Sequence, residues 1–206
     1  MKKMIYAFAL LLASSISLIA CAQGKVSKEQ TKMENKKILA AFFSRTGENY
    51  AVGNITKGNT HIVAEMIAEE TGGKLFQIEP VNPYPNVYNE CVELAKQEQS
   101  ANARPAIKND VKVEDYNVIF IGYPNWWGDM PMPVYTFIEK HDWQRKTVIP
   151  FCTHEGSGLG GTVKKLQQAC KGATVQKGLA VRGQTAQKSR KETQIIVDKW
   201  VDSIFN

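Results

Sequence analysis

Residues with hydroxyl, amide and guanidinium groups stand at positions 44–47 and 58–60 of the sequence. An apolar run at 38–43 precedes the first segment, and apolar residues spaced three and four apart follow the second. A buried strand that leads through a polar loop into a helix N-terminus predicts an anion site, because the loop N–H groups point at one place. Taken alone, the pattern also suits an ordinary polar turn. The predicted phosphate-binding residues are Ser44, Arg45, Thr46, Gly58, Asn59 and Thr60.

Two adjacent tryptophans, Trp126 and Trp127, stand in a segment rich in proline and glycine at 122–129. The flanking residues break helix and strand patterns alike, so we expect these indoles to lie outside the core. An exposed indole can cover a planar aromatic ligand by offset stacking. We therefore predict that Pro124, Asn125, Trp126 and Trp127 bind such a ligand, and an aromatic contact between proteins is the alternative.

A glycine-rich segment at 153–161 follows the apolar run at 147–152. Its glycines allow the backbone to approach a flat ring, and its hydroxyl and N–H groups can bond ring carbonyls. The predicted binding residues are Thr153, His154, Gly156, Ser157 and Gly158. We interpret His154 and Glu155 as a solvated pair rather than as an acid–base couple. No nucleophile elbow or histidine cluster is present in the sequence, so no catalytic residue and no metal ion are predicted.

The first two segments resemble the phosphate loop of flavodoxins, which reads Ser/Thr-x-Thr-Gly-Asn-Thr. Here the motif begins with Ser44-Arg45-Thr46-Gly47, is interrupted by residues 48–57, and resumes with Gly58-Asn59-Thr60. We expect the interruption to widen the site or to cover it. The segments at 122–129 and 153–161 are similar to the two loops with which that family binds the flavin ring. The resemblance covers about residues 37–204 and implies flavin mononucleotide (FMN) as the cofactor.

Strand and helix patterns alternate along the chain. Apolar or alternating runs predict five strands, at 38–43, 74–79, 118–121, 147–152 and 173–181. Amphipathic spacing predicts five helices, which include Ile62, Tyr88, Val134, Leu166 and Trp200. This alternation indicates a doubly wound α/β fold. The resemblance implies a flavodoxin-like parallel sheet of five strands in the order 2-1-3-4-5, with helices on both faces. We expect Pro150 near the end of its strand, because it lacks a ladder donor.

The N-terminal residues have the pattern of an export signal. Lys2 and Lys3 precede a short apolar stretch, and the tetrapeptide Leu18-Ile19-Ala20-Cys21 resembles a bacterial lipobox. The predicted organisation is a lipoprotein signal peptide at 1–20, a flexible tether at 21–36 and a flavodoxin-like domain at 37–206. Lipid attached to Cys21 would anchor the exported chain to a bacterial membrane, facing the periplasm or the cell exterior. A plain secretory peptide, or translation from Met33, is the alternative.

Charge and cysteine content narrow the possible partners. The net charge of +6 falls to +4 without Lys2 and Lys3. No basic block with interleaved aromatic residues is present, so nucleic acid is not an expected partner. The cysteines lack Cys-x-x-Cys spacing, which argues against a disulfide framework or a zinc site. Cys91 and Cys170 fall on apolar helical faces and are predicted to be buried in the core.

Three functions remain open from the sequence. The first is an electron carrier that exchanges electrons with redox partner proteins or small-molecule electron acceptors. The second is an NAD(P)H- or quinone-dependent flavin oxidoreductase, and the third is a lipid-tethered binding module without redox activity. The short chain has no room for a separate nicotinamide-binding domain, which favours the carrier.

Overall fold

The structure is a computed structural model that describes residues 36–205. Its folded unit spans Lys37–Ile204. The predicted signal peptide, Cys21 and nearly all of the predicted tether lie outside the described residues. Within the described part of the chain, no helix is both long enough and apolar enough to cross a membrane.

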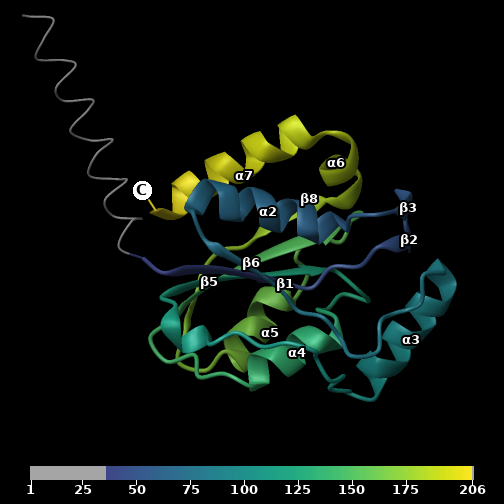
Figure 1. Cartoon of the computed structure of the whole chain (residues 1–206), viewed down its shortest axis with the longest axis horizontal. Helices are drawn as coiled ribbons and strands as arrows, with labels where there is room; N and C mark the ends of the chain where they lie inside the picture. Colours follow the sequence, from purple (N-terminus) through teal and green to yellow (C-terminus); the bar gives the residue numbers. More distant parts are fainter. Residues whose placement is uncertain (1–35, 206) are drawn as a thin grey trace, which may run out of the picture. The chain divides into compact units, whose positions relative to one another are not determined.

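A parallel sheet forms the centre of the fold (Figure 1). Its strands stand in the order β4 (Lys74–Gln77), β1 (Ile38–Phe42), β5 (Val118–Pro124), β6 (Thr147–His154) and β7 (Thr174–Val175), and β8 (Leu179–Arg182) also pairs with β6. All residues of β1 are buried, as are all of β5 except its last. Parallel strands covered on both faces must be apolar throughout, which explains these continuous apolar runs. The predicted strand order is confirmed.

Helices cover both faces of this sheet. Helices α2 (Asn59–Thr71) and α7 (Arg190–Phe205) lie on one face, whereas α4 (Met132–Glu139) and α5 (Thr162–Ala169) lie on the other (Figure 1). On the first face, Phe120 of β5 meets Trp200 of α7 edge-on. On the second face, Phe76 of β4 stacks on Phe137 of α4. These contacts bury the two apolar surfaces of the sheet, and the predicted doubly wound α/β fold is confirmed.

Helix α3 (Tyr88–Ser100) does not cover the sheet in the way the alternating pattern predicts. It lies beside a hairpin formed by β2 (Gly47–Asn49) and β3 (Gly53–Ile55) (Figure 1). Only Cys91 and Ala95 of this helix are buried. The segment after α3 contributes to the core instead, through Ile107, Val111 and Val113. The last of these begins a short 3-10 helix, η1 (Val113–Asp115).

Two predictions about the edge of the sheet are wrong, and they share one cause. The expected strand at 173–181 is split into β7 and β8, and Pro150 lies in the middle of β6. Proline has no N–H to donate to a neighbouring strand. The chain between β7 and β8 passes this position, where a Cβ on Gly178 would stand 2.8 Å from the Pro150 carbonyl oxygen. Strand β6 is therefore continuous, whereas the edge strand beside it is interrupted between β7 and β8.

Candidate functional site

A cavity of about 300 Å³ opens at the carboxyl ends of β1, β5 and β6. This is where doubly wound sheets bind ligands, and the volume is at the lower end for small-molecule sites. The predicted binding residues that line it are Arg45, Asn59, Pro124, Asn125, Trp126, Trp127, Thr153 and His154. The predicted residues outside its lining are Ser44, Thr46, Gly58, Thr60, Gly156, Ser157 and Gly158. Because β5 and β6 are longer than predicted, Pro124, Thr153 and His154 belong to strands rather than to loops.

The hairpin β2–β3 explains how the interrupted loop remains one unit. Its strands pair antiparallel with Gly47 opposite Ile55, so the chain returns close to the point where it left. Gly58 then lies directly against the first segment. A Cβ on Gly58 would stand 2.2 Å from Ser44 Oγ and 2.5 Å from the Arg45 carbonyl oxygen. Glycine is needed here because any side chain would push the two segments apart.

The N-terminus of α2 presents hydrogen-bond donors beside these segments. Ser44 Oγ accepts a hydrogen bond from the His61 N–H at 3.1 Å. The N–H groups of Asn59 and Thr60, in contrast, donate to no atom of the described residues. The Thr46 side chain is exposed, and its hydroxyl forms no hydrogen bond within residues 36–205. Free N–H groups in the first turn of a helix favour an anion, and the donors gathered here suit a phosphate.

Two of the predicted phosphate-binding side chains are engaged within the protein. The hydroxyl groups of Thr60 and Thr153 lie 2.7 Å apart in a shared hydrogen bond, and both residues are buried. This bond ties the start of α2 to the end of β6. The guanidinium of Arg45 donates hydrogen bonds to the carbonyl oxygens of Glu48, Pro85 and Asn86. Arg45 therefore faces backbone oxygens of two other segments.

The two tryptophans differ in their surroundings. They stand in a tight turn in which Trp126 and Asp129 exchange two backbone hydrogen bonds, at 2.9 and 3.0 Å. Trp127 and the glycine after it have φ angles of 55° and 75°, the pattern of a type I′ turn. Trp126 packs edge-on against Phe43 and Tyr84 at the border of the core, whereas Trp127 is 52% exposed. Trp126 is thus partly buried against the core, and only Trp127 lies fully outside it as expected.

Asn125 joins the segments at 122–129 and 153–161, which are the second and third predicted binding segments. Its Nδ2 donates to the Gly158 carbonyl oxygen at 2.9 Å, and its Oδ1 accepts from the Gly128 N–H at 3.0 Å. In the third predicted binding segment, His154 Nδ1 accepts from the Gly156 N–H at 2.9 Å. Burial lowers the pKa of His154, so a neutral imidazole lines the cavity at neutral pH.

Helix α6 (Gly183–Lys188), which the sequence pattern did not predict, forms hydrogen bonds with the side chains of Asn59 and Glu155. Gln187 Nε2 donates to Asn59 Oδ1 at 2.9 Å, and the Gln184 N–H donates to Glu155 Oε1 at 2.7 Å. Gly183 fits closely between them, since a Cβ there would stand 2.1 Å from Asn59 Nδ2. The Glu155 carboxylate is thus held by α6 rather than by the neighbouring histidine.

Several lining residues were not among the predicted binding residues. They are Asn49, Tyr50, Tyr88, Cys91, Val92, Ala95 and Glu155. The α3 residues among them form the apolar helical face that the spacing reveals, but spacing does not tell whether such a face meets a sheet or a cavity. Cys91 is accordingly buried at the cavity wall, whereas Cys170 lies in the core as predicted. Both are free thiols, as is Cys152.

The cavity and the N-terminus of α2 suit two chemically different parts of one ligand. The charged residues of the lining, Arg45 and Glu155, both form hydrogen bonds inside the protein. The rest of the wall is largely aromatic, aliphatic and amide, which suits an uncharged planar ring. The free donors of α2 suit an anion. FMN combines a planar ring with a phosphate, so the residues present fit this cofactor.

Fold and site together define a doubly wound α/β protein with a ligand site at the carboxyl ends of its strands. The sequence model of the flavodoxin family matches residues 37–204, and the chain belongs to this family. No match was found among curated proteins.

Several solved structures are similar to the chain. A protein of Bacteroides eggerthii described as a flavoprotein shares 31% identity, with a TM-score of 0.66 over 82% of this chain and 98% of its own. A second one, from Bacteroides uniformis, shares 29% identity, with a TM-score of 0.64 over 81% and 97%. A flavoprotein of Lactobacillus acidophilus in complex with FMN shares 24% identity, with a TM-score of 0.59 over 81% and 99%.

Proposed function

We propose that the chain binds FMN without a covalent bond and carries electrons between redox partners. The observation that carries this proposal is the position of the free α2 donors beside a cavity with aromatic walls. Ser44, Thr46 and the first N–H groups of α2 hold the phosphate, and Trp127 and Tyr88 contribute walls for the ring. Bound FMN supplies the electron-accepting chemistry, and the protein supplies binding and shielding. Family membership and the FMN complex of the Lactobacillus relative support this assignment.

The test is an absorbance spectrum of the purified full-length protein. We expect a yellow protein that releases FMN on denaturation, takes FMN up again on titration, and loses its colour stepwise with a chemical reductant. A colourless protein that does not take up FMN would refute the proposal and favour a binding module without redox activity. Rapid oxidation of NADH or NADPH with a quinone as acceptor would instead identify a flavin oxidoreductase.

Thr46→Ala tests the position of the phosphate. The Thr46 hydroxyl is exposed and has no partner within the described residues, so it is free to bind an anion. Losing one hydrogen bond to a charged group costs roughly 1.5–3 kcal/mol, which predicts FMN binding weaker by about ten-fold or more. Riboflavin lacks the phosphate, and its affinity is expected to stay unchanged. Titration of flavin fluorescence measures both affinities, and equal losses for the two ligands would contradict this position.

We further propose that lipid on Cys21 anchors the exported protein to a membrane. A signal peptide without twin arginines directs the chain through the general export route as an unfolded polypeptide. An unfolded chain has no assembled flavin site, so FMN is captured after export. The anchor then keeps the carrier at a high effective concentration near redox partners of the same membrane.

Cys21→Ser is expected to abolish lipid attachment and to move the protein from the membrane fraction into the soluble fraction. Metabolic labelling with a fatty acid and cell fractionation measure the two effects. A chain that starts at Met33 serves as the control, and it should purify from the cytoplasm with FMN bound. Native full-length protein that is unprocessed and soluble in the cytoplasm would contradict export.

A further inference from the structure

Helix α3 forms one wall of the cavity but has little support from the core. Its buried residues are Cys91 and Ala95, and both of them line the cavity. An element with few buried apolar contacts keeps its position only through contacts elsewhere. Beyond its first turn, α3 is held by Trp127 and Tyr84. Trp127 Nε1 donates to the Val92 carbonyl oxygen at 3.3 Å, and Lys96 Nζ lies 5.3 Å from the centroid of the Trp127 ring. The Tyr84 hydroxyl donates to Glu98 Oε2.

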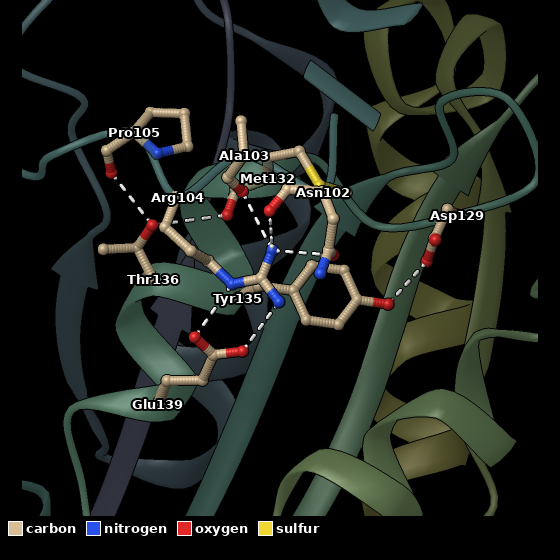
Figure 2. A network of polar contacts seen from close by, with 9 residues as sticks. All are labelled: Asn102, Ala103, Arg104, Pro105, Asp129, Met132, Tyr135, Thr136 and Glu139. Carbon is tan, nitrogen blue, oxygen red and sulfur yellow. Dashed lines mark hydrogen bonds and ion pairs between the residues drawn. The ribbon is translucent and has the colours of Figure 1, made fainter. Parts of the chain in front are cut away.

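The chain beyond the carboxyl end of α3 is fixed to α4 by Arg104 (Figure 2). Two guanidinium nitrogens of Arg104 donate to both carboxylate oxygens of Glu139, at 2.8 and 2.7 Å. The third donates to the carbonyl oxygen and to the side chain of Asn102, both at 2.9 Å. Figure 2 also shows Tyr135 next to this guanidinium, with its hydroxyl donating to Asp129 at 2.9 Å. This end of the helix is therefore held independently of the cavity.

The amino end of α3 is held by residues of the interrupted phosphate motif. Arg45 donates to the Pro85 carbonyl oxygen from Nε at 3.1 Å and from Nη2 at 2.6 Å, and to the Asn86 carbonyl oxygen at 2.8 Å. Glu48 binds the same segment through two groups. Its N–H donates to the Asn86 carbonyl oxygen at 2.9 Å, and its Oε2 accepts from the Tyr88 N–H at 3.0 Å. The negative carboxylate of Glu48 also interacts favourably with the positive, N-terminal end of the helix dipole.

The hairpin also packs closely against the start of α3. Gly47, with a φ of 81°, lies so close that a Cβ would stand 3.0 Å from the Asn86 carbonyl oxygen. The Tyr50 ring stacks on the Tyr88 ring, with centroids 6.2 Å apart and planes 29° apart. The inserted hairpin thus meets the start of α3 through backbone, charge and aromatic contacts.

We propose that Arg45 and Glu48 are positioning residues that hold α3 in place as a wall of the flavin site, and that Arg45 does not bind the phosphate. The inference deepens the proposed function, because it assumes that this cavity receives the flavin ring. Apparent affinity falls in proportion to the fraction of molecules whose site is formed. Loosening α3 must therefore weaken every ligand that uses this wall, with or without a phosphate. A direct phosphate contact would matter for FMN alone.

The test compares FMN and riboflavin binding in Arg45→Met and Glu48→Ala. Both variants are expected to lose about ten-fold in affinity, by the same factor for the two ligands. Glu48→Gln keeps an acceptor for the Tyr88 N–H and should restore most of the affinity. Arg190→Met makes the same chemical change as Arg45→Met at the exposed start of α7, and it should bind both flavins like the parent. Loss of FMN affinity alone, or no loss, in Arg45→Met would overturn the proposal.

Hydrogen exchange measured without flavin separates this inference from the proposed function. In Glu48→Ala, and in Arg45→Met if that variant folds, amides of residues 88–100 should exchange faster while those of β1, β5 and β6 keep their protection. Unchanged exchange in α3 of Glu48→Ala would refute the positioning role even in a protein that binds FMN. Faster exchange of α3 in Glu48→Ala than in the parent would support the positioning role. If the parent protein also takes up no flavin, the proposed function is refuted while the positioning role stands.

Discussion

Gly58→Ala is expected to weaken FMN binding by about 100-fold, because the new methyl group collides with two atoms of the phosphate loop. Its Cβ would stand 2.2 Å from Ser44 Oγ and 2.5 Å from the Arg45 carbonyl oxygen, and the second of these belongs to the backbone. The loop must therefore move away from the start of α2. About two hydrogen bonds to the phosphate, each worth roughly 1.5–3 kcal/mol, would then lose their geometry.

Fluorescence titration with FMN and riboflavin measures this effect. We expect the larger loss for FMN, because the displaced segment carries the donors for the phosphate. Gly161→Ala is the matched control, since Gly161 has a φ of −86° and its added Cβ would meet nothing within 4 Å. This control should bind FMN like the parent. Normal FMN affinity in Gly58→Ala would show that close approach of the two segments is not needed.

Gly122→Ala is expected to lower the free energy of unfolding by about 3 kcal/mol, at the upper end for an overpacked core. Gly122 lies in β5 beside Phe151 of β6, and an added Cβ would stand 2.0 Å from the far end of that ring. Phe151 is fully buried, so its ring has no free space to enter. For a domain of this size, the melting temperature should fall by roughly 6–12 °C.

A smaller residue at position 151 should relieve this clash. Phe151→Leu alone is expected to destabilise the protein by leaving a cavity, but it should restore part of the stability lost in Gly122→Ala. Thermal unfolding of both single variants and of the double variant measures the coupling. Strictly additive losses would show that the ring and the new methyl group do not compete for one space. Gly161→Ala again serves as the glycine control.

The local sequence pattern was sufficient to predict the central fold. Strands β1 and β5 are apolar at nearly every position because a parallel strand between two helical layers has no face toward water. The same constraint makes α2 amphipathic, and it places the polar residues that follow β1 at the carboxyl end of the sheet. The fold class and the neighbourhood of the candidate site therefore follow from short-range periodicity. The strand order, in contrast, was implied by the resemblance of the interrupted Ser44 and Gly58 motif to the flavodoxin phosphate loop.

Tertiary structure decided what each apolar face and each charged group meets. The apolar face of α3 lines a cavity instead of covering the sheet, and Trp126 is partly buried against Phe43 at the border of the core. Periodicity reports that a face is apolar and not which surface covers it. Arg45 looked like a phosphate ligand, yet its acceptors include backbone oxygens of Pro85 and Asn86, forty or more residues further along the chain. Such long-range partners leave no local pattern, because any carbonyl brought near by the fold can accept the hydrogen bond.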